Sequence, residues 1–351
     1  MQSPFFSICI PQYNRTSFLI EALRVLATQT FTDFEVCISD DCSTDGREDE
    51  VLAALNGFGL RHVYRRQPVN LRYDGNLRAA LTLASGKYCL LMGNDDCLAS
   101  PDVLQRLFEK LSIAPEVGAV VTNYVSGSDG HISRRVRSGR RSKGTALLAA
   151  QRFRNFSFVS GILLRRDRAA AHATAAWDGA EMYQMFLASR ILAEGYELLE
   201  LEDIAVVHGI QIPGETVDSY GSRPRVWPCP IIERPLPLAR MGALVCDAIQ
   251  PFAGCSSFWA FAVFLQIVLF TYPFWIVEYR RVQSWRFAVG ICLGLRPVRQ
   301  LDGVSISPVY RLLLNVTFLA VTIVGLLIPM NAFDFLRPKF YGFAKAVLQW
   351  S

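Results

Sequence analysis

Apolar runs of strand length alternate with segments of helical periodicity along the first hundred residues of the chain. The pattern predicts strands at 5–10, 34–39, 61–66 and 87–92. Between them it predicts helices at 17–29, through VLAAL at 51–55, and at 75–85. Strands and helices that alternate through short loops favour a mostly parallel sheet covered by helices on both faces, so the expected fold class is α/β.

The alternation continues, less regularly, to about residue 210. We expect helices at 101–111, near 145–152 and through 181–195, and strands at 117–125, 158–166, 196–201 and 204–210. The stretch 211–240 is rich in proline and poorly periodic, which is typical of a connection. We therefore predict a first domain over residues 1–235.

The remaining residues, 236–351, are predicted to form a hydrophobic, helical membrane region. Segments 257–277 and 309–330 each reach the ~20 apolar residues that cross a hydrocarbon core. The composition agrees, because 51% of the residues are hydrophobic and the mean hydropathy is +0.24. Buried helices of a soluble core are the alternative, and the length of the two segments disfavours it.

Arginines complicate the membrane topology. Two full spans would place the arginines between them on the far side, against the preference for positive charge on the cytoplasmic side. Either 285–295 and a neighbour are re-entrant or lie in the interface, or the rule fails here. The N-terminus lacks the pattern of a signal peptide, so we expect the first domain at the cytoplasmic face of the inner (plasma) membrane. The arginines concerned are Arg280, Arg281, Arg286, Arg296 and Arg299.

Polar clusters follow three of the predicted strands, at 11–14, 40–45 and 94–96. In sheets of this class, ligands bind beyond the carboxyl ends of the strands. Asp95 and Asp96 have three possible uses: capping the next helix, acid–base work in a hydrolase, or holding a divalent cation against a phosphate. Capping favours Asp96 or Ser100, and metal binding ranks above hydrolysis. Asp40 and Asp41 repeat the pattern of acid after strand, with Ser43, Thr44 and Asp45 as expected caps of the following helix.

A basic run, RRVRSGRRSK at 134–143, holds six cationic residues in ten positions. It suits a solvated loop, a phosphate clamp or a patch facing anionic lipid. With apolar segments on the same chain, the phosphate and membrane roles become about as plausible as the solvated loop. The candidates are Arg134, Arg135, Arg137, Arg140 and Arg141.

Three segments in order, FSICIPQYN, FTDFEVCISDDCSTDG and NLRAALTLASGKYCLLMGNDD, resemble the N-terminal half of a family 2 glycosyltransferase with the GT-A fold. The resemblance covers residues 5–100 and, more loosely, extends to about 210. It implies a nucleotide-diphosphate sugar donor, a Mg²⁺ or Mn²⁺ ion, and displacement with inversion at the anomeric carbon. LLMGNDD is also reminiscent of transferases of dideoxy sugars in bacterial O-antigen synthesis.

The resemblance assigns roles at the strand ends. Pro11 and Tyr13, with Asn14 and Asn94, would shape the nucleotide pocket, and Asp40 or Asp41 would contact the base. Asp95 falls at the last Asp of the family's D-x-D motif and would hold the metal, helped by Asp96 or Asn94. Gly93 replaces the first Asp of that motif, and Cys42 stands where the family usually has Gly. His208 is a further possible metal ligand, although a lone histidine is more often structural.

The acceptor hydroxyl needs a general base, which family members supply near the start of a late helix. Counting back from Arg190 places Gln184 at the usual Asp position, so Glu181 is the first choice and Asp178 the second. Glu181 could equally sit there because a carboxylate favours the first turn of a helix.

The resulting hypothesis is a metal-dependent enzyme that adds one sugar to a lipid-linked (polyprenyl-diphosphate) saccharide, since the Q-x-x-R-W signature of processive synthases is not found in the expected place. We expect no nucleic-acid partner. The alternatives are a membrane-anchored, non-catalytic scaffold with a degenerate transferase domain, and a transferase that loads polyprenyl phosphate directly.

Overall fold

The computed structural model describes residues 3–215, 237–253, 257–282, 284–301 and 303–349. The chain forms two compact units, one of residues 1–145 and 154–222 and the other of residues 146–153 and 223–351. The boundary expected at residue 235 lies outside the described residues. Helix α5 (Ala146–Arg152) groups with the C-terminal unit. Sequence periodicity cannot reveal this grouping, because it depends on contacts with residues about a hundred positions away.

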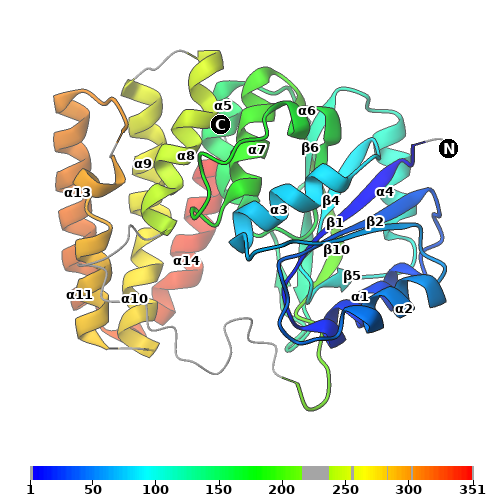
Figure 1. The fold of residues 1–351 in the computed structure, drawn as a ribbon. Coiled ribbons are helices and arrows are strands. Elements are labelled where there is room, and N and C mark those ends of the chain that lie inside the picture. The colour runs from blue at the N-terminus through cyan, green and yellow to red at the C-terminus, as the bar shows by residue number, and fades with distance from the viewer. Residues whose placement is uncertain (1–2, 216–236, 254–256, 283, 302, 350–351) are drawn as a thin grey trace. The chain divides into compact units, whose positions relative to one another are not determined.

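The N-terminal unit is built on one mixed β-sheet (Figure 1). Its strand order is β3-β2-β1-β4-β9-β6-β10-β5. Strands β1 to β4 pair in parallel, as do β6 and β10. Strand β9 runs antiparallel to both of its neighbours. The expected α/β class is confirmed, with antiparallel strands in the second half of the sheet. The strands are β1 Phe6–Gln12, β2 Phe34–Asp40, β3 His62–Arg66, β4 Tyr88–Leu91, β5 Cys97–Leu98, β6 Val117–Ser126, β7 Ile132–Ser133, β8 Arg140–Ser142, β9 Ile162–Arg165 and β10 Glu197–His208.

Helices cover both faces of this sheet (Figure 1). Alternation along β1 directs Phe6, Ile8 and Ile10 to one face, where they are fully buried. That face packs against α1 (Thr16–Leu26), α2 (Glu48–Gly57) and α4 (Val103–Ser112). Each such side chain contributes ~1.5–3 kcal/mol on burial. The other helices of the unit are α3 (Arg72–Leu83), α6 (Arg166–Ala171) and α7 (Tyr183–Glu194), with a short 3-10 turn at Phe153–Phe156.

Two sequence-based boundaries differ from the structure. The strands expected at 196–201 and 204–210 are one strand, β10, whose pairing with β6 shifts register between Glu200 and Ile204. The irregularity breaks the alternation that strand prediction uses. Helix α4 begins at Val103, and neither Asp96 nor Ser100 caps it: the described residues give its N-terminus no side-chain cap. The capping role expected for these two residues is wrong.

The C-terminal unit is helical. Two segments, Ser257–Arg281 and Pro308–Leu327, are long and apolar enough to cross a membrane. The helices are α8 Pro237–Ala253, α9 Ser257–Phe270, α10 Tyr272–Val282, α11 Trp285–Gly294, α12 Pro297–Gln300, α13 Pro308–Leu327 and α14 Met330–Gln349.

The two long apolar segments run side by side in the same direction. Phe261 stacks on Tyr310, and Tyr272 stacks on Phe318, with ring centroids 4.6 Å apart in both pairs. A simple two-span hairpin would make the segments antiparallel. A parallel pair requires the chain between them to return, and the ten residues of α11 rise only ~15 Å at ~1.5 Å per residue. Helix α11 is therefore long enough to cross only half of a ~30 Å hydrocarbon core.

Helix α13 exposes one apolar face. Within its most apolar stretch only 17% is buried, compared with 50% for Ser257–Arg281. The exposed side chains recur every three or four residues, which places them along one side of the helix. They are Val309, Leu312, Leu313, Val316, Leu319, Ile323, Val324 and Leu327.

Candidate active site

Polar loops meet beyond the carboxyl ends of β1, β2 and β4. Asn94 Nδ2 donates to Gln12 Oε1 at 2.8 Å, which joins the loop after β4 to the end of β1. The Asn14 backbone N–H donates to Ser43 Oγ at 2.8 Å, and the Thr44 N–H donates to Asn14 Oδ1 at 2.7 Å. These bonds join the loop after β1 to the loop after β2. The three clusters found in the sequence therefore form one polar rim.

The Ser-Thr-Asp run after β2 is held by the neighbouring loop. Thr16 Oγ1 donates to Asp45 Oδ2 at 2.6 Å, while Ser43 and Thr44 contact Asn14. Helix α2 begins at Glu48, and no side-chain cap is found for it among the described residues. The helix-capping role expected for these three residues is wrong, because their polar atoms fasten the rim instead.

Asp40 shapes the turn after β2. Its carboxylate accepts the Tyr64 hydroxyl at 2.6 Å and the Ser43 N–H at 2.7 Å, and Arg66 Nη1 lies 3.8 Å away. Burial and the Asp40 carboxylate raise the pKa of the Tyr64 phenol. Asp40 is thus committed to holding this turn together.

Asp41 connects the rim to α3. Its Oδ1 accepts the Leu71 N–H at 2.5 Å. Burial raises the pKa of Asp41, and hydrogen bonds from the Leu71 and Arg72 N–H groups oppose that rise. Next in the chain, Cys42 has a φ of 61°. This left-handed region favours glycine and costs other residues ~1–2 kcal/mol, which accounts for the family's usual Gly at that position.

Pro11 and Tyr13 flank the end of β1. Pro11 pairs with Ser39 across the parallel ladder. Tyr13 follows the strand, and its side chain is 43% exposed. The tyrosine ring is therefore accessible at the rim, while Pro11 fixes the backbone beside it.

Asp95 forms an ion pair that the sequence did not suggest. Arg15 Nη1 lies 2.9 Å from Asp95 Oδ2, and each side chain is 14% exposed. Burial and the charge of Asp96 raise the pKa of Asp95, while Arg15 lowers it. The net direction is upward, so Arg15 offsets only part of the unfavourable energy of placing two carboxylates together.

Asp96 is buried, and its carboxylate binds other groups of the protein. Its Oδ1 lies 2.9 Å from His208 Nδ1 and accepts the Gly209 N–H at 2.9 Å, and its Oδ2 accepts the Ser160 hydroxyl. The hydrogen bond to Asp96 raises the pKa of His208. Both oxygens of Asp96 are therefore used, and it orients His208 at the end of β10 rather than facing a ligand.

Lack of space for a side chain explains why residue 93 is a glycine. A Cβ at this position would lie 3.0 Å from Asp96 Oδ2 and 3.2 Å from Asp95 Oδ1. The Gly93 N–H donates to Ser160 Oγ at 2.8 Å, which ties the backbone down. Replacement of the family's first Asp by glycine therefore accompanies a packing in which the two remaining carboxylates lie close to this backbone.

The residues at this edge fit a divalent cation with few protein ligands. Within the described part of the chain, no group of three or more His, Cys, Asp or Glu side chains is arranged to hold a metal ion. Mg²⁺ commonly takes one or two carboxylates and completes its shell with substrate phosphate oxygens and water. Burial, and after it the charge of Asp96, raise the pKa of Asp95, so a cation bound there would stabilise its ionised form. Asp95 and His208 are thus the protein groups suited to such an ion.

The two carboxylates expected as general base lie before α7 under different constraints. Asp178 is paired with Arg78, whose Nη2 donates to Asp178 Oδ2 at 2.8 Å and whose Nη1 contacts the other oxygen. Both oxygens of Asp178 are therefore already engaged by a guanidinium. Glu181 is exposed, with a φ of 57°. Gln184 is buried and so lies away from solvent.

The basic run divides into one half-buried arginine and several exposed ones. Arg135 donates to the carbonyl oxygens of Thr122, Phe158 and Ser160 at 2.7–2.8 Å. Burial lowers the pKa of Arg135 to about 10. The surface role expected for Arg135 is therefore wrong, because its guanidinium is used within the fold. Arg141 pairs with Glu197. The exposed members are Arg134, Arg137, Arg140 and Arg141.

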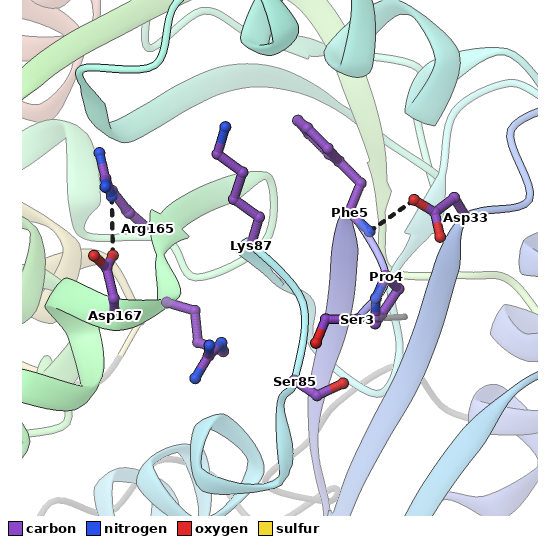
Figure 2. A pocket seen from close by; sticks show the side chains of 9 residues that line it. Ser3, Pro4, Phe5, Asp33, Ser85, Lys87, Arg165 and Asp167 are labelled. Carbon is purple, nitrogen blue, oxygen red and sulfur yellow. Dashed lines mark hydrogen bonds and ion pairs between the residues drawn. The ribbon is translucent and has the colours of Figure 1, made fainter. Parts of the chain in front are cut away.

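A cavity of about 400 Å³ lies at the opposite edge of the sheet (Figure 2). Phe5 and Lys87, which line it, come directly before β1 and β4, so the cavity is at the amino ends of these strands. Lys87 Nζ lies 5.5 Å from the Phe5 ring centroid, and Arg165 pairs with Asp167. The cavity takes no part in the rim.

The sequence did not point to three residues that structure the site: Arg15, Ser160 and Asp74. Arg15 directly follows the first cluster, so a cation in a strand-end loop was a usable signal. For Ser160 and Asp74 the sequence held no such signal, because each forms its hydrogen bond with a residue more than sixty positions away.

The α/β sheet with this rim at its carboxyl edge has a GT-A-like fold. Residues 7–172 match the family model described as glycosyl transferase family 2. This part of the chain is a family 2 glycosyltransferase domain.

Curated glycosyltransferases match this chain over short segments, in agreement with the family model. The abequosyltransferase RfbV of Salmonella typhimurium is 44% identical over 95 residues, which are 26% of this chain and 28% of that protein. A PGL/p-HBAD biosynthesis glycosyltransferase of Mycobacterium bovis is 35% identical over 107 residues, 30% of this chain and 41% of that one. The chain thus spans less than half the length of these relatives.

Solved structures show the same fold. TarS 1–349 of S. aureus in complex with UDP has a TM-score of 0.59 at 15% identity, covering 91% of this chain and 90% of that one. The mannosyltransferase PcManGT of Pyrobaculum calidifontis, in complex with GDP-Man and Mn²⁺, has a TM-score of 0.51 at 15% identity, covering 93% and 88%.

Proposed function

We propose that the protein is an inverting glycosyltransferase that moves a single sugar from a nucleotide-diphosphate sugar to a lipid-linked saccharide. The observation that carries this proposal is the polar rim, where the loops of Asn14, Asp41 and Asp95 meet at the carboxyl edge of a family 2 domain. Ligands of open α/β sheets bind at this edge.

The nucleotide lies across the ends of β1 and β2. The exposed ring of Tyr13 offers an apolar surface to the base. Asp41 is only 3% exposed and accepts the Leu71 N–H, so its carboxylate would reach a donor group of the base only through its remaining acceptor positions. Asn14 and Asn94 supply amide groups on either side of the nucleotide. Because hydrogen bonds between Asn14 and the loop after β2 and from Asn94 to the end of β1 hold these loops together, the site is organised before the donor arrives.

The donor diphosphate lies at the end of β4. Asp95 and His208 would hold a Mg²⁺ or Mn²⁺ ion there, and the contact of Asp96 with Nδ1 orients the His208 ring. The bound ion would stabilise the negative charge that develops on the leaving diphosphate. Arg15, already at Asp95, adds positive charge to the same place.

The reaction is one displacement. The acceptor hydroxyl oxygen bonds to the anomeric carbon on the face opposite the diphosphate, and the bond from that carbon to the phosphate oxygen breaks. The electron pair of the broken bond leaves with the nucleoside diphosphate, and Glu181 takes the hydroxyl proton. Attack opposite to the leaving group inverts the anomeric centre. Glu181 is preferred to Asp178 because Arg78 already neutralises Asp178.

The acceptor is carried by lipid at the cytoplasmic face of the inner membrane. The exposed apolar face of α13 supports this, since an apolar surface of this length on a helix suits the boundary of acyl chains and head groups. Basic side chains of the C-terminal unit, such as Arg296, Arg299 and Arg311, suit anionic head groups. The exposed arginines of the basic run would meet the acceptor diphosphate.

The first test is calorimetric titration of the detergent-solubilised protein with UDP, GDP, CDP and dTDP, each with and without Mn²⁺. We expect one of them to bind, and Mn²⁺ to strengthen that binding. If none binds in either condition, the transferase proposal fails and the non-catalytic scaffold, which Gly93 suggests, takes its place. Hydrolysis of the matching nucleotide sugar then separates an enzyme from a binding protein, since a scaffold turns over no donor.

A further inference from the structure

A buried carboxylate on α3 binds the backbone around the expected general base. Asp74 is 1% exposed. Its Oδ2 accepts the Glu181 N–H at 2.8 Å, and its Oδ1 accepts the Tyr183 N–H at 3.1 Å. Burial raises the pKa of Asp74, and the N–H groups of Gly179, Glu181 and Tyr183 oppose that rise. Burying a carboxylate is unfavourable unless it is hydrogen-bonded, so these contacts account for its presence in the interior.

The backbone that Asp74 holds is strained. Glu181 has a φ of 57°, a conformation that costs a non-glycine residue ~1–2 kcal/mol. Such a conformation persists only where its surroundings enforce it. Met182, the N-cap residue of α7, makes no side-chain capping hydrogen bond. Asp74 therefore supplies from another helix the acceptors that both the strained residue and the helix N-terminus need.

The same helix reaches the nucleotide side of the rim. Just before α3, the Leu71 N–H donates to Asp41. Further along, Asn76 Nδ2 donates to the Gln12 carbonyl oxygen at 3.0 Å. Asp74 lies between these two contacts in the chain. The first turns of α3 thus bind the ends of β1 and β2 on one side and the loop of Glu181 on the other.

We infer that Asp74 is a positioning residue for catalysis, which fixes the carboxylate-bearing loop at Glu181 and registers it against the nucleotide pocket through α3. The inference rests on the proposed function, because it takes Glu181 as the general base. It assigns Asp74 no contact with substrate.

The test compares Asp74→Asn with the parent enzyme. The amide keeps the size of the side chain but turns one acceptor into a donor, which opposes one of the N–H groups. We expect kcat to fall by ~10–100-fold, since a small misplacement of a catalytic group can cost ~10²-fold. The Kd of the nucleoside diphosphate and the KM of the donor should stay within about twofold, because Asp41 keeps its contacts.

A double-mutant cycle with Glu181→Gln separates positioning from general structural support. If Asp74 acts through Glu181, Asp74→Asn lowers kcat in the parent but adds little in the Glu181→Gln background. An equal fold-loss in both backgrounds would overturn the inference. Glu35→Gln is the matched control: Glu35 is also a buried carboxylate that accepts a backbone N–H, from Ser85, but it lies away from the rim. It should lower stability without lowering kcat.

The failures are distinguishable. If Glu181→Gln leaves turnover unchanged, the assignment of the base fails and the inference falls with it, while nucleotide binding still tests the rest of the proposed function. If Glu181→Gln lowers turnover and Asp74→Asn does not, only the inference falls. Thermal unfolding checks that each variant is folded. Should Asp74→Asn not fold, Asp74→Glu keeps the charge on a longer stem and should lower kcat with nucleotide affinity retained; unchanged kcat in this variant would overturn the inference.

Discussion

Arg15 and Asp95 form an ion pair, 2.9 Å between Nη1 and Oδ2, that joins the loop after β1 to the loop after β4. The pair places a protein cation beside the carboxylate expected to hold a metal. It therefore links the two parts of the rim that we propose bind the nucleotide and its diphosphate.

Asp95→Asn should remove metal-dependent binding of the donor. The amide keeps the shape of the side chain but lacks the charge that attracts a divalent ion. We expect transfer to fall ~10²-fold or more, and binding of the nucleoside diphosphate to become insensitive to Mn²⁺. Calorimetry with Mn²⁺ and with EDTA measures this. Full activity of the variant in excess EDTA would rule out the metal role of Asp95.

Arg15→Met should strengthen the binding of Mn²⁺ alone while weakening the binding of the donor. Removing the guanidinium leaves Asp95 beside Asp96 with less positive charge nearby, so an added cation is attracted more strongly. The donor diphosphate loses a cation at the same time. Titrations with Mn²⁺ alone and with the nucleoside diphosphate separate the two effects. Weaker binding of Mn²⁺ alone would show that the guanidinium is not its competitor.

Gly93→Ala should destabilise the domain. The added Cβ would lie 3.0 Å from Asp96 Oδ2 and 3.2 Å from Asp95 Oδ1, and overpacking typically costs ~1–3 kcal/mol. Gly93→Asp, which restores the family's first Asp, should be worse, because it adds a third negative charge. Urea unfolding of both variants provides the measurement. A Gly93→Asp protein as stable as the parent would contradict the steric reason given for this glycine.

Arg135→Lys should lower stability, whereas Arg137→Lys should not. The guanidinium of Arg135 donates to three carbonyl oxygens at once, and an ammonium cannot match that planar geometry. Each carbonyl left without its partner costs ~1–3 kcal/mol. Arg137 is exposed on the same loop and provides the matched control. Equal melting temperatures for the two variants would mean that the buried contacts contribute little.

Leu312→Glu combined with Leu319→Glu should weaken binding to vesicles that contain anionic phospholipid. Both side chains are about 60% exposed, at 63% and 59%, so the fold should tolerate the change while the apolar face gains two negative charges. Ile113→Glu with Val69→Glu makes the same substitution at exposed apolar residues of the N-terminal unit. Flotation with vesicles compares the two. Equal flotation of both double variants would count against α13 as the membrane-facing helix.

Much of the first unit could be read from periodicity. Strands β1 to β4 and the helices between them were predicted close to their observed bounds. For β1, β2 and β4 the reason is that burial on both faces of a sheet requires a continuous apolar run. The antiparallel insertion of β9 between β4 and β6 left no such trace. Strand direction depends on which neighbour completes the hydrogen bonds, and residues 71 positions apart decide it, as Leu91 and Ile162 do.

By itself, the sequence determined the fold class, the acidic strand ends at Asp41 and Asp95, and the family. These are local properties, since a motif needs only its own spacing and a strand only its own pattern. Only the tertiary structure decided which carboxylates are engaged by hydrogen bonds or ion pairs within the protein. Asp40, Asp74 and Asp96 are used by hydrogen bonds from distant segments, whereas Asp95 meets a cation. Electrostatic energy depends on distance and burial, and the order of residues in the chain contains neither.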